Sequence, residues 1–251
     1  MRLQQFVESA DERALSLVVV NRESPRPIQT MLEGLFDGQP VEVDERRLPD
    51  GDDDVVLLVD DGEIVASSPL AALQESILLV NSDLYITGTR AATDVEIPDV
   101  VAAMENVRFT LRGYPESNKE KLLLITISRY IERLALENDG GTHRASFQRL
   151  SRIDDELGTR RVYERLAAST VDTHVYGVPD WTPPPDFEVT MHGGWTPTFR
   201  DSWFVTFASE SADGPHAALV ALETEPRVWD GFWTFDSGDT RRISRYIERR
   251  L

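Results

Sequence analysis

Side chains that commonly do chemistry are few in this sequence, apart from carboxylates. It contains no cysteine and four histidines, which are His143, His174, His192 and His216. No histidine pair has the HExxH or i, i+4 spacing of a helical zinc site. Without cysteine there is also no thiolate nucleophile and no thiolate metal site. The sequence therefore predicts no bound metal ion.

Two of the histidines lie in neighbouring predicted strands. His174 and His192 could converge there with Asp180, which follows the first of these strands. The alternative, which we favour, is that each is a hydrogen-bonded histidine within a strand. Carboxylates are too abundant for any acid–base pair to stand out, and the sequence has no nucleophile elbow, P-loop or dinucleotide-binding fingerprint. We therefore expect neither an enzymatic activity nor a cofactor.

Aromatic side chains are the remaining candidates for a binding site, and all five tryptophans fall between residues 162 and 235. Such rings can bind a flat ligand or a partner protein, although most rings in a folded protein fill its core. A site is favoured where rings meet polar groups, as they do around the proline-rich turn at residues 179–185. The candidate ligand-binding residues are Tyr176, Asp180, Trp181, His192, Trp203 and Trp233.

The charge balance is strongly acidic. The 251 residues include 44 Asp and Glu against 26 Lys and Arg, which gives a net charge of −18. Only Lys119 and Lys121 are lysines. Self-repulsion at this charge strains a fold unless concentrated salt screens it. The composition therefore indicates a cytoplasmic protein from a salt-accumulating halophile, with an acidic protein from an ordinary cell as the alternative.

The same charge argues against direct binding of nucleic acid, because phosphate recognition needs a basic surface. No apolar run approaches the roughly 18 residues that a membrane-spanning helix needs. The N-terminal residues also lack the apolar stretch of a signal peptide. We expect a cytoplasmic protein without membrane insertion.

In the first half of the chain, apolar runs separated by turn residues predict a mixture of strands and helices. The sequence Asp60-Asp61-Gly62 between two apolar runs is typical of a β-hairpin turn. Strands are predicted at 14–21, 41–43, 55–59, 63–67 and 107–112, and helices at 28–36, 69–80 and 97–104.

The clearest helix is predicted at 117–137. Ser117 and Glu120 form a capping box at its start, and the sequence NDGG at 138–141 ends it. One face of this helix is apolar, and it could pack on the core, which we favour, or form the seam of a homodimer. This face is made by Leu123, Ile127, Tyr130 and Leu134.

The second half is predicted to be richer in strands. A helix is expected at 161–168, strands at 172–178, 187–192, 202–208, 216–223 and 228–235, and a final helix that Asp236 or Asp239 caps. The heptapeptide ISRYIER occurs twice, at 127–133 and 243–249. The repeat indicates either a pair of duplicated lobes, each closed by such a helix, or a coincidence between two amphipathic helices.

These elements predict an α/β (α+β) protein with a mixed, largely antiparallel sheet and flanking helices. We expect an N-terminal α/β lobe at 1–113 and a C-terminal lobe at 114–251, which could form one compact unit. If the ISRYIER repeat reflects duplication, the two lobes are related to each other.

Several segments resemble one known family. They are VYERLAAS-x-VD-x-HVYGVPDW-x-PP from residue 162, SWFVTF at 202–207, ALVALE at 218–223 and W-x-GFWTF at 229–235. Together they resemble the DICT sensory domain, which is named for its occurrence with diguanylate cyclases and two-component systems. The segments RGYPESNKEKLLL at 112–124 and ASFQRLSR at 145–152 resemble the haloarchaeal single-domain members. The C-terminal lobe is thus similar to a DICT domain.

The resemblance implies a sensory, non-catalytic module, but it assigns no ligand and no functional residue. The sequence has no cyclase or helix-turn-helix segment, so we expect the output to pass through another protein. The predicted function is a cytoplasmic regulatory module that binds a small ligand or a partner protein and relays a signal to a separate output protein. The alternative is a structural adaptor for protein–protein interaction that has no small-molecule ligand.

Overall fold

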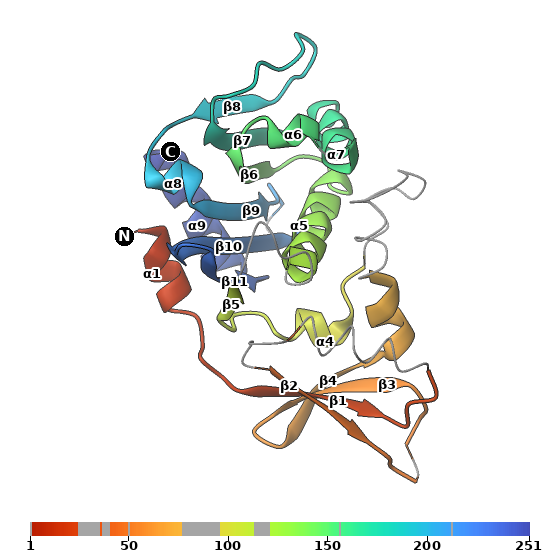
Figure 1. Ribbon diagram of the computed structural model, residues 1–251. Helices are drawn as coiled ribbons and strands as arrows, with labels where there is room; N and C mark the ends of the chain where they lie inside the picture. Colours follow the sequence, from red (N-terminus) through yellow and green to blue (C-terminus); the bar gives the residue numbers. More distant parts are fainter. Residues whose placement is uncertain are drawn as a thin grey trace.

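A computed structural model describes residues 2–24, 36, 41–49, 51–76, 96–112, 121–155, 157–211 and 213–251. Most of the helix predicted at 28–36 lies outside these residues, and so does the capping box of Ser117 and Glu120. The chain forms two β-sheets with helices packed around them (Figure 1). The expected α+β class with mixed sheets is confirmed.

The smaller sheet is built from residues 15–69 in the strand order β2-β1-β3-β4. Its strands are β1 (Leu15–Val20), β2 (Val41–Arg46), β3 (Val55–Asp60) and β4 (Glu63–Pro69). β1 and β2 are parallel, and the other pairs are antiparallel. The predicted hairpin between β3 and β4 is confirmed. Its turn has positive φ angles at Asp61 (49°) and Gly62 (83°), as a two-residue hairpin turn requires.

The larger sheet has seven strands in the order β5-β11-β10-β9-β6-β7-β8. The strands β6, β7 and β8 are parallel to one another, and all other neighbours are antiparallel. β6 has no counterpart among the strands predicted from the sequence. The strands are β5 (Phe109–Arg112), β6 (Thr142–Arg149), β7 (Asp172–Val178), β8 (Thr190–Gly193), β9 (Ser202–Ala208), β10 (His216–Glu225) and β11 (Val228–Thr234).

Helices cover both faces of the larger sheet (Figure 1). One face carries α5 (Lys121–Leu136), α6 (Arg152–Asp155) and α7 (Leu157–Ala167). The other carries α1 (Leu3–Glu8), α8 (Pro197–Arg200) and α9 (Ser237–Arg250). Asp236 caps α9, as predicted, because its carboxylate accepts a hydrogen bond from the Asp239 amide at 2.8 Å.

The two ISRYIER segments lie in α5 and α9. Both helices pack against β9 and β10 of the larger sheet. The expectation that each lobe is closed by its own ISRYIER helix is therefore wrong: the repeat covers the two faces of one sheet. Duplication of the lobes themselves is not tested by this arrangement.

The apolar core continues from one sheet to the other. Val56 and Leu58 of β3 are fully buried and belong to the same apolar cluster as Phe109 and Trp233 of the larger sheet. Between the two sheets lies α4 (Asp99–Ala102), which packs against β3 and β4. The division into lobes at residues 113 and 114 stays a prediction. Within the described residues, no helix combines the length and the apolar composition needed to cross a bilayer.

Candidate functional site

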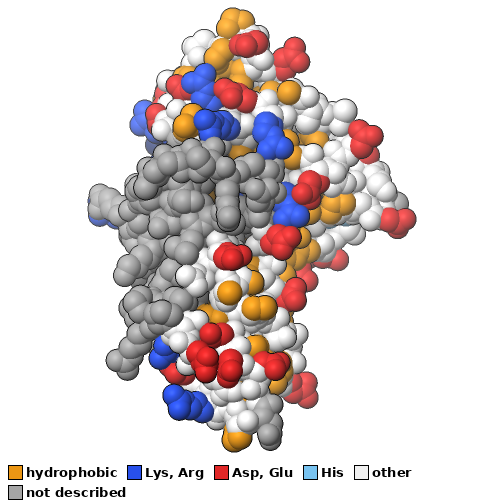
Figure 2. All heavy atoms as spheres, turned by 90° about the vertical axis from the view of Figure 1, so that its right-hand side faces the viewer, with side chains coloured by type: hydrophobic (Ala, Val, Ile, Leu, Met, Phe, Trp, Pro, Cys, Tyr) orange, Lys and Arg blue, Asp and Glu red, His pale blue; other side chains and the backbone are white. Residues whose placement is uncertain are grey.

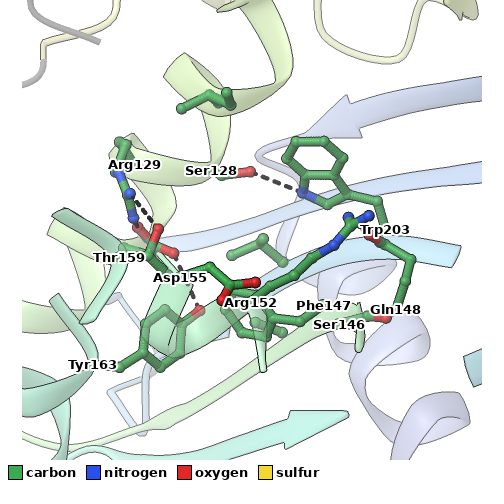
Figure 3. A pocket seen from close by; sticks show the side chains of 14 residues that line it. Ser128, Arg129, Ser146, Phe147, Gln148, Arg152, Asp155, Thr159, Tyr163 and Trp203 are labelled. Carbon is green, nitrogen blue, oxygen red and sulfur yellow. Dashed lines mark hydrogen bonds and ion pairs between the residues drawn. The ribbon is translucent and has the colours of Figure 1, made fainter. Parts of the chain in front are cut away.

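A cavity of about 260 Å³ lies between the larger sheet and the helices on its α5 face (Figure 3). The helices α5, α6 and α7 form its walls, and β6 and β9 form its floor. We call it the α5–α7 cavity. It is lined by Ile125, Ser128, Arg129, Glu132, Ala145, Ser146, Phe147, Gln148, Arg152, Asp155, Thr159, Tyr163, Trp203 and Val205.

A buried ion pair forms one wall of the cavity. Arg129 and Glu132 are 6% and 4% exposed, and their spacing of three residues places them on one face of α5. The Arg129 Nη1 atom lies 2.7 Å from Glu132 Oε2, and Nη2 donates to Thr159 Oγ1 of α7 at 2.8 Å. Buried charges are tolerated only when they are paired and hydrogen-bonded in this way. The pair therefore depends on α7, which supplies the additional hydrogen bonds.

Tyr163 of α7 completes this polar wall. Its hydroxyl donates a hydrogen bond to Glu132 Oε1 at 3.1 Å. Burial, with a further contribution from the charge of Glu132, raises the pKa of Tyr163 well above its ordinary value. The phenol therefore remains protonated and acts as a donor at any physiological pH.

The opposite wall of the cavity is aromatic. Trp203 lies on β9 with its side chain toward α5, and its indole Nε1 donates to Ser128 Oγ at 3.2 Å (Figure 3). Trp203, Val205 and Phe207 alternate along β9, and all three pack on the α5 face. An indole edge held by a hydrogen bond leaves the apolar ring surface for contact with a ligand.

Arg152 and Gln148 lie at the edge of the cavity. Gln148 follows an irregularity in β6 and has a φ of 56°, and its Nε2 donates to the Ser202 carbonyl at 2.7 Å. Arg152 of α6 donates to Gln148 Oε1 and extends beside Trp203 (Figure 3). The short helix α6 therefore contributes a long side chain with a cationic end to the boundary of the site.

Three of the predicted site residues lie elsewhere in the larger sheet. Tyr176 and His192 stack on each other with ring centroids 4.3 Å apart, on the α9 face. Arg144 Nη1 donates to the Tyr176 hydroxyl at 2.8 Å. Trp233 is 2% exposed and packs against Phe109 in the core. None of these three residues lines the α5–α7 cavity.

The favoured interpretation, a hydrogen-bonded histidine within a strand, is confirmed for His174 and His192, and the two side chains also meet, since His174 Nδ1 and His192 Nε2 are 3.0 Å apart. Asp172, not Asp180, is the carboxylate beside them, at 2.8 Å from His174 Nε2. Burial, followed by the charges of His174 and Arg144, lowers the pKa of His192. The other interpretation, in which both histidines converge with Asp180, is wrong because Asp180 follows the far end of β7.

Asp180 and Trp181 have structural partners at the proline-rich turn. Asp180 accepts hydrogen bonds from Arg149 Nε at 2.7 Å and from the Ser151 amide at 3.0 Å. These bonds outweigh the opposing effect of burial, which is the largest single contribution, and the pKa of Asp180 is lowered. Trp181 packs edge-on against Phe187, with the two ring centroids 5.7 Å apart. Of the six predicted residues, Trp203 alone lines the cavity, and ligand contacts of the other five stay predictions.

Sequence reasoning missed most of the cavity, including Arg129, Glu132, Gln148 and Tyr163. One signal was present: in the first ISRYIER, two opposite charges three residues apart are interleaved with isoleucines that must face the core. Within the described residues, no group of three His, Cys, Asp or Glu side chains could hold a metal ion. The geometry is suited to binding a small polar molecule.

The fold and the site define an α+β protein with a cavity between its larger sheet and the helices on one face of that sheet. Residues 100–224 match the model of the DICT family, described as the sensory domain in diguanylate cyclases and two-component systems. The matched segment includes every residue that lines the α5–α7 cavity. This segment of the chain belongs to the DICT family and is a sensory domain. Comparison with curated proteins and with solved structures finds no match to the chain.

Proposed function

We propose that this protein is a non-catalytic sensing module that binds a small molecule in the α5–α7 cavity and relays its presence to a separate output protein. The observation that carries the proposal is the composition of the cavity. It combines a buried ion pair, Arg129 with Glu132, and an indole face, Trp203, inside a sensory domain. A few fixed polar groups beside apolar surface are typical of small-molecule sites.

The proposed ligand is a small planar molecule with both hydrogen-bond donors and acceptors. Its ring would contact Trp203 and Phe147, which line the cavity. Its polar atoms would meet Gln148, Arg152 and Asp155 at the edge. Because the lining includes cations and anions, a neutral or zwitterionic molecule suits it better than a strongly charged one.

The proposed relay is a displacement of α6. This helix has only four residues, and its Arg152 connects it to Gln148 at the edge of the cavity. A ligand shifts a conformational equilibrium only if it binds one state better than the other. A ligand that replaces Gln148 as the partner of Arg152 would do so. Leu157, at the start of the adjoining α7, is 57% exposed and would move with α6, which gives an output protein an apolar group to contact.

The proposed setting is the cytoplasm of a cell with concentrated internal salt. The net charge of −18 supports this setting, because self-repulsion of that size is relieved by screening. Tests on the protein are therefore made in molar potassium chloride.

A cavity-filling variant tests the binding proposal. Ala145 lies on the floor of the cavity and is 1% exposed, so Ala145→Leu directs added volume into the ligand space. We expect the variant to fold, because filling a cavity commonly stabilises a protein. A library of planar molecules with about 10 to 20 heavy atoms is screened by melting temperature, since a ligand that binds only the native state raises it.

Compounds that raise the melting temperature of the unmodified protein should leave that of Ala145→Leu unchanged. Native mass spectrometry of the protein purified in ammonium acetate gives a second measurement, through any co-purified small molecule. Equal shifts in both proteins would place the ligand outside the cavity and contradict the proposal.

The second candidate function is an adaptor without a small-molecule ligand. It is favoured by exposed apolar side chains at Leu48, Ile64, Val65, Leu157 and Trp195. An adaptor needs such groups to form a contiguous patch. These residues come from β4, from the start of α7 and from two separate loops, and Figure 2 shows acidic side chains spread among the hydrophobic ones on the visible face. The adaptor hypothesis is therefore weaker, and it predicts that Ala145→Leu retains its partner protein.

A further inference from the structure

A second hollow of about 440 Å³ lies where the strands β6, β7 and β10 end. Four of the nine residues that line it are arginines, namely Arg149, Arg152, Arg200 and Arg227. One acidic residue, Glu223, lines it as well. In a chain with 44 acidic and 26 basic residues, a hollow with this excess of cations is unexpected by composition alone. We call it the arginine hollow.

The arginines reach the hollow from three separate parts of the chain, namely residues 149–152, residue 200 and residue 227. Arg149 ends β6, Arg152 begins α6, Arg200 ends α8, and Arg227 lies in the turn between β10 and β11. Segments far apart in sequence therefore converge to place like charges around one space. Like charges brought together repel one another unless anions offset them. Asp180 already pairs with Arg149, and an anion bound in the hollow would offset the charges of the others as well.

Hydrogen bonds fix two of these positions in advance. Arg149 Nε donates to Asp180 Oδ2 at 2.7 Å, and Asp180 is itself held by Ser151. The backbone of Arg227, which has a φ of 67°, is fixed by its amide donating to Glu223 Oε1 at 2.7 Å. Glu223 thus orients the turn as well as offsetting one positive charge. Side chains that are positioned before binding lose less conformational entropy when the ligand arrives.

Trp195 adds a planar surface to the rim of the hollow. It is the most exposed of the large apolar side chains in the described residues, at 68%. An indole left in water beside cations is suited to stacking with a flat ring whose substituent is anionic. Arginine is also the side chain best matched to phosphate oxygens, because its planar group donates two parallel hydrogen bonds.

We propose that the arginine hollow binds a nucleotide, with its phosphates among Arg149, Arg200 and Arg227 and its base stacked on Trp195. The volume of about 440 Å³ falls within the usual range for small-molecule sites. The site is separate from the α5–α7 cavity but adjacent to it, because Gln148 and Arg152 line both. The same arginine therefore lines both spaces.

Three probes separate the parts of this proposal: ATP, adenosine and inorganic pyrophosphate. Binding is measured by isothermal titration calorimetry between about 0.5 and 2 M potassium chloride, because screening should weaken phosphate contacts as the salt concentration rises. ATP should bind most tightly, pyrophosphate more weakly and adenosine weakest. The affinity for ATP and pyrophosphate, but not for adenosine, should fall with salt.

Exposed residues of the hollow supply variants that are expected to fold. Arg200→Gln and Arg227→Gln should each weaken both ATP and pyrophosphate by about tenfold or more. Trp195→Ala should weaken ATP by about tenfold and leave pyrophosphate within about twofold, since the ring contacts only the base. Arg249→Gln is the matched control. It removes one exposed arginine from α9, on the other face of the sheet, and should change neither affinity by more than about twofold.

Far-UV circular dichroism and melting temperature confirm that each variant is folded. The proposal is overturned if ATP does not bind at millimolar concentration, or if Arg200→Gln has no larger effect than Arg249→Gln. Equal loss of ATP and pyrophosphate in Trp195→Ala would overturn the assignment of the base to Trp195. Ala145→Leu should bind ATP normally, so failure of the cavity proposal and failure of this one are distinguishable.

Discussion

The same seven residues, ISRYIER, occupy α5 on one face of the larger sheet and α9 on the other. In both helices the two isoleucines are fully buried, at 127 and 131 in α5 and at 243 and 247 in α9. The serines also correspond. Ser128 accepts from Trp203 Nε1 and Ser244 from Arg144 Nε, each at 3.2 Å. The side of each helix that faces the sheet therefore behaves alike in the two copies.

The charged positions differ completely. Arg129 and Glu132 are buried and paired beneath α7. Arg245 and the side chain of Glu248, their equivalents in α9, are exposed, the latter by 58%. The sequence of the helix cannot account for the difference, because it is identical. What packs beside the helix decides it. The helix α7 contacts α5 and supplies hydrogen-bond partners for the charged pair, whereas α1 contacts α9 through the ring of Phe6.

The largest expected contrast is at the glutamates. Glu132→Gln leaves Arg129 buried without its anion and should lower the free energy of unfolding by about 3 kcal/mol. Glu248→Gln removes an exposed charge whose ion pair with Arg144 is long, at 3.8 Å, and it should change the free energy of unfolding by about 1 kcal/mol or less. Urea unfolding in molar salt measures both, at constant m-value. If Glu132→Gln and Glu248→Gln lowered the free energy of unfolding by similar amounts, packing of α7 would not determine the environment of Arg129 and Glu132.

The next largest contrast between the α5 face and the α9 face of the larger sheet is expected in how stability depends on pH. His143 is fully buried on the α5 face, and burial, with a smaller contribution from His174, lowers its pKa from 6.5 to about 3. The unfolded chain then binds a proton that the folded chain excludes. The stability that neutral His143 provides is therefore complete above pH 6.5 and is lost as the pH falls toward 3.

Removing the His143 imidazole should make the free energy of unfolding depend less steeply on pH in acid. In His143→Phe, the slope of unfolding free energy against pH below about 6.5 should decrease by up to about 1.4 kcal/mol per pH unit. His192→Phe, on the α9 face, should change the slope over a narrower range, because His192 is only partly buried. Unfolding is followed by tryptophan fluorescence across the pH series, and an unchanged slope in His143→Phe would contradict the assignment.

The smallest contrast is at the serines, where the substitution in α9 is expected to cost more stability than the one in α5. Ser128→Ala removes the acceptor of a neutral indole N–H and should cost about 1 kcal/mol. Ser244→Ala removes an acceptor of the buried, charged Arg144 and should cost about 1.5 to 2 kcal/mol. Unfolding midpoints of the pair give the comparison. If Ser128→Ala lost more unfolding free energy than Ser244→Ala, the cavity beside α5, and not the charge of the donor, would determine what each serine contributes to stability.

Prediction from sequence succeeded where a strand carries its own pattern. The strands at 172–178 and 202–208 have the predicted bounds, because β-branched and aromatic residues are dense in both. β6 reads THRASFQR and has no such pattern. Its polar residues Arg144 and Ser146 are buried, with partners at Ser244 and Ser202 that only the folded chain brings near.

The candidate site was less predictable for a related reason. Trp203 could be identified as a large ring on a strand, but the rest of the α5–α7 cavity is assembled from α5, β6, α6 and α7. Which helix covers which strand is a property of topology and not of local sequence. The arginine hollow is a sharper case, because its four arginines come from three parts of the chain that only the fold brings together.

The helix α1 has a consequence for how the chain folds. It contains six residues, fewer than the roughly 12 to 15 that an isolated helix needs to be stable in water. Its buried residues Leu3, Phe6 and Val7 pack in the cluster that contains Ile243 and Ile247, and the ring of Phe6 meets Tyr246 at 6.2 Å. Contacts across more than two hundred residues of chain form slowly, because a long loop must close first. We therefore expect the first helix in the sequence to be among the last to acquire its native packing, and protection of its amides from hydrogen exchange would report its docking against β10, β11 and α9.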